Sequence, residues 1–243
     1  MSIINPYRYA AADFTCDAVS FDGSNDYLIK SSDWTSNANS KVGIMSVFIQ
    51  FQGGDGAFVN MASITDGDLG MAKGASGNKL YMKVGSTISA ANGSTDIADD
   101  DTWHHIIFAW DAAADTRHGY VDGSSDFSLS GSDVDFDWTQ AAHTIGASAN
   151  GSSKIFADVA EFYINNEEYL DISDAANLQK FRDTDGKPVD LGADGSEPTG
   201  SSPRVYLHLD DGETVANFAV NAGTGGDYSI TGALATASTS PTD

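Results

Sequence analysis

The chain has 243 residues, which fits one large domain or two small ones. Hydrophobic residues make up 41%, just under the globular average, and 35 acidic residues against 12 Lys and Arg give a formal net charge of -23. This charge excludes general nucleic-acid binding, because few side chains could neutralise phosphates, and it disfavours anionic membrane surfaces.

The cysteine content and the hydropathy of the sequence exclude further kinds of protein. Cys16 is the only cysteine, so the chain forms no internal disulfide and no cysteine-based metal site. No apolar run approaches the ~20 residues of a membrane-spanning helix. The N-terminal residues have no apolar core behind a basic start and therefore predict no secretory signal. We expect a protein that stays in a cytoplasm or is assembled there into something larger.

The sequence predicts many short strands joined by turns rich in Gly, Ser, Asp and Asn. In residues 44–52, Met45, Val47, Ile49 and Phe51 alternate with more polar positions, which indicates a strand with one buried face. A helix is predicted over residues 175–182, capped by Ser173 or Asp174. The remaining strands are expected at 18–29 (strand, turn, strand), 57–64, 69–72, 79–84, 103–111 with 118–123 as a hairpin, 143–147 and 154–165.

After residue 182 the composition changes. Residues 183–203 hold three of the five prolines and predict a long loop. Short strands are expected at 204–210, 217–221 and 227–234, completing the same sandwich rather than forming a second domain. The predicted organisation is an N-terminal arm over 1–16, a sandwich over 17–234 with closing strands in 204–234, and a frayed tail over 235–243.

Four segments, in this order, resemble the laminin-G-like group of concanavalin A-like lectin/glucanase domains. They are AVSFDGSNDYLIK, SVFIQFQ, WHHIIFAWD with HGYVDG, and IGASANGSSKIFADVAEFYINNEEYLD, within about residues 17–182. The resemblance implies an all-β fold, an antiparallel jelly-roll β-sandwich with one short helix. The tail from residue 180 is similar to a segment that accompanies such domains in virion proteins of tailed bacteriophages, which are made in the host cytoplasm without a signal peptide.

The strand at 154–165 resembles the catalytic strand of laminarinase-type glycoside hydrolases, whose motif is Glu-x-Asp-x-x-Glu. Asp158 and Glu161 match the second and third positions, but Phe156 occupies the position of the nucleophile. A spacing of three also predicts that Asp158 and Glu161 point to opposite faces. Retaining hydrolysis needs two carboxylates ~5–5.5 Å apart. We therefore assign no catalytic residue and expect no enzyme.

The adjacent pair His104 and His105 raises the question of a zinc site. Neighbouring residues on a strand point to opposite faces, so the two rings cannot easily chelate one ion, and packing explains the run better.

Two sets of residues are candidates for binding. Asp22, Asn25 and Asp26 cluster in one turn and are candidate calcium ligands, although Asp and Asn are also ordinary turn residues. Trp34 and Trp138 fall in expected loops, where exposed rings would stack on sugars or contact a partner; burial in the core is the alternative.

Three functions follow from these features. The first is a non-enzymatic structural protein of a phage particle, a capsid decoration or a fibre- or tail-associated component, located in the virion and binding other virion proteins and itself as a homo-oligomer. The alternative is a carbohydrate-binding module that recognises bacterial surface glycans. A divergent glycan hydrolase is the third, and Phe156 disfavours it.

Overall fold

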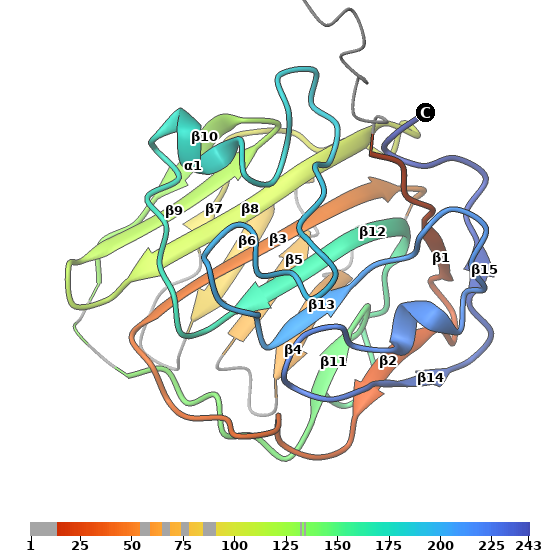
Figure 1. The fold of residues 1–243 in the computed structure, drawn as a ribbon, viewed down its shortest axis with the longest axis horizontal. Helices are drawn as coiled ribbons and strands as arrows, with labels where there is room; N and C mark the ends of the chain where they lie inside the picture. Colours follow the sequence, from red (N-terminus) through yellow and green to blue (C-terminus); the bar gives the residue numbers. More distant parts are fainter. Residues whose placement is uncertain are drawn as a thin grey trace, which may run out of the picture.

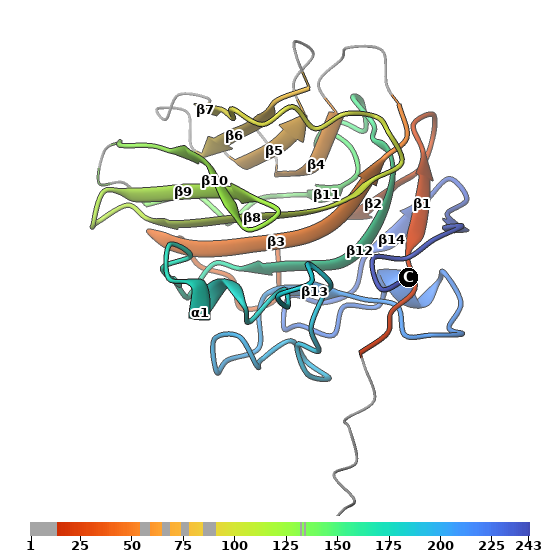
Figure 2. The same ribbon diagram turned by 90° about the horizontal axis from the view of Figure 1, so that it is seen from above.

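The computed structural model describes residues 14–53, 59–64, 69–73, 78–84, 91–131, 133 and 135–243. Two antiparallel sheets pack face to face with one short α-helix, which confirms the expected jelly-roll β-sandwich (Figures 1 and 2). Among the described residues, no helix is both long enough and apolar enough to cross a bilayer.

The first sheet has eight strands in the order β10-β9-β8-β3-β12-β1-β15, with β13 also paired to β12. The expected hairpin is confirmed, since β8 and β9 pair antiparallel with Asp111 opposite Thr116. The strands of this sheet are β1 (Val19–Asp22), β3 (Val42–Phe51), β8 (Trp103–Asp111), β9 (Thr116–Val121), β10 (Ser124–Ser128), β12 (Phe156–Asn165), β13 (Val205–Leu207) and β15 (Ala235–Thr236).

The second sheet has seven strands in the order β14-β2-β11-β4-β5-β6-β7. β1 and β2 follow one another in sequence but belong to different sheets, so the turn between them carries the chain from one layer to the other. The strands of this sheet are β2 (Tyr27–Lys30), β4 (Val59–Ile64), β5 (Leu69–Lys73), β6 (Leu80–Val84), β7 (Ala91–Asn92), β11 (His143–Ile145) and β14 (Ser229–Thr231).

The main core lies between the sheets. The predicted inward face of β3 is confirmed, because its four alternating apolar side chains are all buried there: Met45, Val47, Ile49 and Phe51. Ile106, Phe108 and Trp110 of β8 join them. Full burial of an aliphatic or aromatic side chain contributes roughly 1.5–3 kcal/mol, so the two long central strands supply much of the stability of the sandwich.

The outer face of the first sheet is covered by a third layer. This covering layer comprises α1 (Ala175–Leu178) and the loop 183–203, and it lies on the side of the sheet away from the second sheet (Figure 2). Leu178, Phe181 and Leu191 pack there against Ile107 and other residues of the sheet. The side chain of Asp174 caps α1 by accepting the N–H of Ala176 at 2.9 Å, as predicted.

The helix is shorter than predicted, because it ends at Leu178 instead of residue 182. Arg182 forms an isolated bridge with Pro188, which turns the chain back on itself.

The C-terminal third adds strands to both sheets and corrects two predictions. The expected strand at 217–221 is wrong: Asn217–Ala219 is a 3-10 helix, in which Phe218 and Ala219 are both buried while Val220 is exposed, so the alternation of a strand is broken. The expectation of a frayed tail at 235–243 is also wrong. β15 pairs with β1, and Ser240 is buried and accepts the N–H of Thr242 at 3.2 Å.

Most of the predicted N-terminal arm, residues 1–16, lies outside the described residues. Of its last three residues, Cys16 is buried and forms an isolated β-bridge with Asp210, so this position belongs to the sandwich.

A β-bulge in β12 changes which side chains face the core. Ala160 pairs with Phe48 of β3 and Tyr163 pairs with Ser46, so β12 has one extra residue, and Glu161 there has a φ of +48°. Because of the extra residue, the core-facing positions are odd-numbered before the bulge and even-numbered after it: Ala157, Val159, Phe162 and Ile164. A strict alternation of inward and outward side chains through residues 156–164 is therefore interrupted at Glu161.

Glu161→Gln should change the pH dependence of stability. Burial raises the pKa of Glu161 from 4.5 to about 8, so the native state keeps a proton that the unfolded state releases above its own pKa. This group therefore destabilises the native state progressively between about pH 5 and about pH 8. The glutamine variant should gain unfolding free energy relative to the wild type over that range, as measured by urea denaturation. Glu197→Gln, at an exposed site, is the control, and a constant difference between wild type and Glu161→Gln would contradict the prediction.

Candidate functional site

The two acidic residues of β12 are buried. Asp158 lies opposite Ser20 and Gln50, and its carboxylate accepts a hydrogen bond from Gln52. Glu161 accepts a hydrogen bond from the Tyr206 hydroxyl at 2.8 Å.

Asp158 and Glu161 thus both point to the outer face, and the predicted opposite orientation is wrong because the bulge adds one residue to β12 and reverses the alternation there. Burial raises the pKa of both carboxyl groups. Phe156 holds the position of the nucleophile, and Asp158 and Glu161 are both buried. β12 therefore presents no exposed pair of carboxylates to a substrate.

The two histidines of β8 have separate partners. His105 is buried, with its Nε2 2.8 Å from the Ser46 hydroxyl, and burial lowers its pKa to about 3, so the ring is neutral. His104 Nδ1 lies 2.7 Å from a carboxylate oxygen of Asp122. The pair therefore does not converge on one ion, and the Ser46–His105 pair is closed to solvent.

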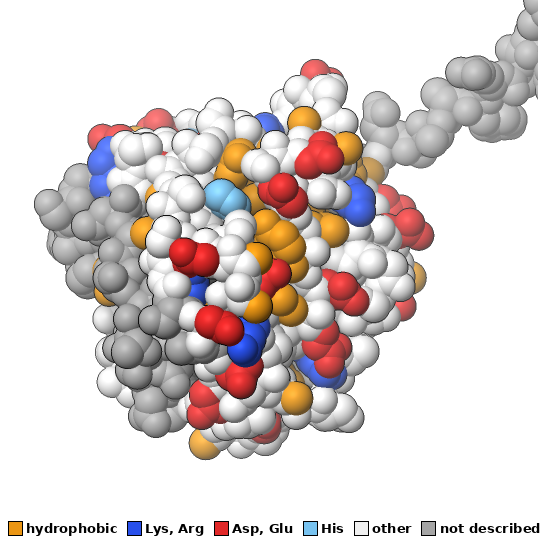
Figure 3. All heavy atoms as spheres, turned by 90° about the vertical axis from the view of Figure 1, so that its left-hand side faces the viewer, with side chains coloured by type: hydrophobic (Ala, Val, Ile, Leu, Met, Phe, Trp, Pro, Cys, Tyr) orange, Lys and Arg blue, Asp and Glu red, His pale blue; other side chains and the backbone are white. Residues whose placement is uncertain are grey.

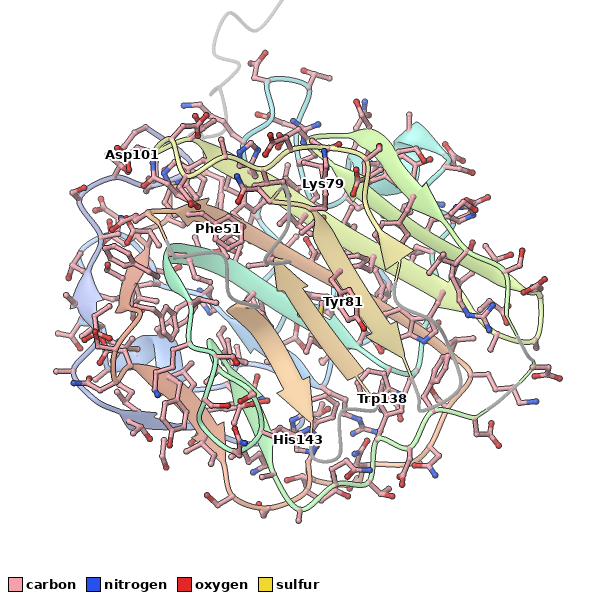
Figure 4. All side chains as sticks on the ribbon, turned by 180° about the vertical axis from the view of Figure 1, so that it is seen from behind. Phe51, Lys79, Tyr81, Asp101, Trp138 and His143 are labelled. Carbon is pink, nitrogen blue, oxygen red and sulfur yellow. The ribbon has the colours of Figure 1, made fainter. Side chains whose placement is uncertain are left out.

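Trp34 and Trp138 are not exposed, contrary to their prediction as sugar or partner contacts. Trp34 stacks on His143 with centroids 4.1 Å apart and on Trp138 at 5.6 Å, and Trp138 stacks on Trp110 at 5.8 Å. Trp138 and His143 lie at the same end of the molecule in Figure 4. The loops carrying Trp34 and Trp138 thus extend the core and close this end of the sandwich.

The predicted calcium ligands form a tight turn held by backbone hydrogen bonds. One oxygen of Asp22 accepts the N–H groups of Ser24 at 2.8 Å, Asn25 at 2.9 Å and Asp26 at 3.2 Å. The N–H of Asn25, with those of Ser24 and Asp26, lowers the pKa of Asp22. Asp26 accepts the N–H of Ala233 at 2.7 Å. These bonds account for the turn without a cation, and calcium at Asp22, Asn25 and Asp26 stays a prediction.

An open groove lies on both sides of Phe14 and Thr15. It consists of two hollows with volumes of about 500 Å³ and about 710 Å³, which share Phe14, Thr15 and Asp190. Small-molecule sites typically occupy ~300–1,000 Å³, so each hollow has a suitable size. We call it the Phe14 groove; its other lining residues are Asp183, Asp185, Lys187, Pro188, Val189 and Thr242 in the smaller hollow, and Gly192, Ala193, Tyr206, His208, Asp210 and Asp211 in the larger.

A stacked pair of rings lies in the larger hollow. The Tyr206 and His208 rings are nearly parallel, with centroids 4.6 Å apart, and His208 Nδ1 lies 3.2 Å from a carboxylate oxygen of Asp210. Tyr206 is buried and His208 is partly exposed, so the imidazole is the accessible face of the pair. Asp210 orients that imidazole from the side.

The walls of the groove come from segments far apart in sequence. The N–H of Cys16 reaches the Thr242 hydroxyl at 3.5 Å, and Lys187 Nζ donates to the carbonyl of Asp243 at 3.1 Å. One oxygen of Asp183 accepts the N–H of Lys187 at 2.8 Å. The C-terminal tail therefore holds the N-terminal segment and the covering layer together.

The Phe14 groove is strongly acidic. Its lining carries five aspartates and one lysine. Within the described part of the chain, no three His, Cys, Asp or Glu side chains are placed to hold a metal ion. The carboxylates are instead suited to accept hydrogen bonds from hydroxyl groups, and they oppose an anionic ligand.

The sequence alone does not mark these groove residues as a site. Tyr206, His208 and Asp210 alternate along a predicted strand, so their common face was available as a signal. Phe14 gave no such signal, because it lies in the predicted arm and becomes part of a site only through the tail and the covering layer.

The comparison with family models gives the class of protein. The model of the concanavalin A-like lectin/glucanases superfamily matches residues 22–171, and the chain belongs to this superfamily. No curated protein matches the chain in sequence.

Solved structures share the fold at low sequence identity. A carbohydrate-binding candidate from Bacteroides ovatus superposes with a TM-score of 0.66 and 14% identity, covering 93% of this chain and 61% of its own. The heptameric SAP-like pentraxin of Limulus polyphemus has a TM-score of 0.60 and 11% identity, covering 93% of this chain and 96% of its own. The chain thus spans about three fifths of the Bacteroides ovatus protein, and these similarities establish the fold alone.

Trp138→Ala should destabilise the protein strongly, because it removes the middle of the ring stack and leaves a cavity. Loss of a fully buried Trp costs about 3–5 kcal/mol of unfolding free energy, measured by chemical denaturation. If Trp138 instead acted as a surface contact, the variant would unfold like the wild type, and that result would contradict its structural role.

Proposed function

We propose that this protein is a non-catalytic carbohydrate-binding protein and that the Phe14 groove holds the glycan. The observation that carries the proposal is the composition of the larger hollow, where the His208–Tyr206 stack lies beside Asp210 and the ring of Phe14. Flat rings suit the apolar C–H faces of sugars, and carboxylates accept hydrogen bonds from their hydroxyl groups.

Charge selects among glycans. The groove is acidic and the chain carries a net charge of -23, so uronate, sialylated or sulfated glycans are disfavoured. An uncharged or amino-substituted glycan is the expected ligand. The superfamily and the Bacteroides ovatus candidate support a lectin-like use of this fold.

The absence of catalysis is part of the proposal. Asp158 and Glu161 are buried, and Phe156 replaces the nucleophile of the hydrolase motif. The role as a phage structural protein rests on the resemblance of the tail from residue 180 and stays a prediction.

His208→Ala and Asp210→Asn should each weaken glycan binding roughly tenfold, because each removes a hydrogen-bonding or stacking group worth about 1.5 kcal/mol. A glycan array of uncharged, amino-substituted and anionic oligosaccharides identifies the ligand, and isothermal titration measures its affinity. Asp96→Asn, an exposed carboxylate outside the groove, is the matched control and should bind like the wild type. Equal affinity of all variants would place the glycan elsewhere, and a preference for anionic glycans would contradict the charge argument.

No hydrolysis of β-glucans is expected from the purified protein. Glu161→Gln should leave this baseline unchanged, because the side chain it replaces is buried and hydrogen-bonded to Tyr206. Release of reducing ends measures turnover. Turnover by the wild type that disappears in Glu161→Gln would overturn the non-catalytic assignment.

A further inference from the structure

The covering layer does not extend over the whole outer face of the first sheet. β9 alternates between buried and partly exposed residues, and His118 and Tyr120 are among the partly exposed ones. His118 lies opposite Ala109 of β8, and Tyr120 lies opposite Ile107. Ala109 and Ile107 belong to the cluster beneath the covering layer, so His118 and Tyr120 point to the same outer face at its margin.

The edge strand β10 continues this open face with hydroxyl groups. Ser125 pairs with Tyr120, and Ser128 pairs with His118. Both serines are exposed. A row of rings on β9 is therefore bordered by a row of hydrogen-bonding hydroxyls on β10.

The segment between β12 and α1 adds a second ring and a carboxylate. Tyr169 is partly buried and packs on the same cluster as Tyr120. Burial, then Asp171 and Asp111, and then Tyr120 raise the pKa of Tyr169 to about 12, so its phenol stays protonated and able to donate. Ser173 lowers the pKa of Asp171, and the charge of His118 adds to the effect. Tyr169 and Tyr120 thus pack on one cluster, and Asp171 follows Tyr169 by two residues on the same segment.

Figure 3 faces the end of the molecule that carries the turn between β8 and β9. It shows hydrophobic side chains gathered in a band, with acidic side chains on both sides of it. Such a surface is apolar along its middle and rich in acceptors along its borders.

We propose that this surface, the tyrosine shelf, binds an uncharged glycan chain as a second site; its residues are His118, Tyr120, Ser125, Ser128, Tyr169 and Asp171. The two phenol rings contact the C–H faces of sugar units, while the serine hydroxyls, the imidazole and the carboxylate exchange hydrogen bonds with sugar hydroxyls. The surrounding carboxylates oppose a polyanionic chain. The inference rests on the proposed carbohydrate binding, but none of these residues lines the Phe14 groove.

The experiment measures binding of soluble polysaccharides by affinity electrophoresis, with laminarin, xyloglucan and galactomannan as uncharged probes and polygalacturonate as the anionic one. The variants are Tyr120→Ala, Tyr169→Ala and their double variant, with Tyr169→Phe as the conservative replacement and Tyr27→Ala on the second sheet as the control. Thermal unfolding and sedimentation velocity are recorded for each. If an alanine variant fails to fold, Tyr169→Ser and His118→Ala take its place.

The double variant should bind an uncharged polysaccharide at least roughly tenfold more weakly, and Tyr27→Ala should bind like the wild type. Tyr169→Phe keeps the ring and should bind more tightly than Tyr169→Ala. The groove variant His208→Ala should keep shelf-dependent binding. Wild-type binding that the shelf variants leave unchanged would overturn the tyrosine shelf alone. A wild type that binds none of the glycans, here or on the array, would overturn the proposed function as well. A shift in oligomeric state with unchanged affinity would assign the shelf to subunit contact and overturn the inference.

Discussion

The first sheet buries one face against the second sheet and the centre of the other face against the covering layer, and most of the structure follows from this requirement. β12 lies near the middle of that sheet, and its first half pairs with β1 while its second half pairs with β13. The bulge at Glu161 lies between the two halves and reverses the alternation there. Apolar side chains thereby reach the core along the whole strand, at the expense of one residue in a left-handed conformation.

Burial of the outer face of the first sheet also sets the protonation state of its polar residues. His105, Asp158 and Glu161 are buried there, and burial favours their neutral forms. In a hydrolase of this superfamily the corresponding strand has to face a substrate. Here the C-terminal third occupies that side, and both proposed binding surfaces lie at the margins of the covering layer.

Much of the fold followed from the sequence, because the alternation in residues 44–52 and 103–111 is strong and the strands are long. The bulge in β12 could not be predicted from the sequence. This strand is apolar on both faces, so one inserted residue does not change its hydrophobic pattern. In the segment 217–221, Phe218 and Val220 alternate with small or polar residues as in a strand, but only Phe218 is buried, so the pattern predicts a strand where the chain forms a 3-10 helix. Trp34 and Trp138 looked exposed because they stand in loops, and only the tertiary fold brings the two loops together into one ring stack.

The candidate site was harder to predict, because its residues meet only in three dimensions. The alternation in residues 204–210 fixed a common face for Tyr206 and His208, but nothing in the sequence indicated that Phe14 would lie beside them. The acidic turn from Asp22 to Asp26 was predicted to bind calcium; oxygens of Asp22 and Asp26 accept backbone N–H groups there, and the calcium site stays a prediction. The acidic composition of the sequence therefore indicated turns as candidate sites. The Phe14 groove forms only when distant segments of the chain pack together.

The hydrogen bond between Cys16 and Thr242 has a consequence for how this sandwich is joined to other polypeptides. It brings the two ends of the described chain to one spot, where the start of the sandwich and the C terminus lie together in Figure 1. Domains with neighbouring ends are readily inserted into a loop of a host protein, because the insertion does not force the host apart. A cargo fused after the C-terminal residue would therefore emerge at the rim of the Phe14 groove, which Thr242 lines, whereas no residue of the tyrosine shelf lines that groove.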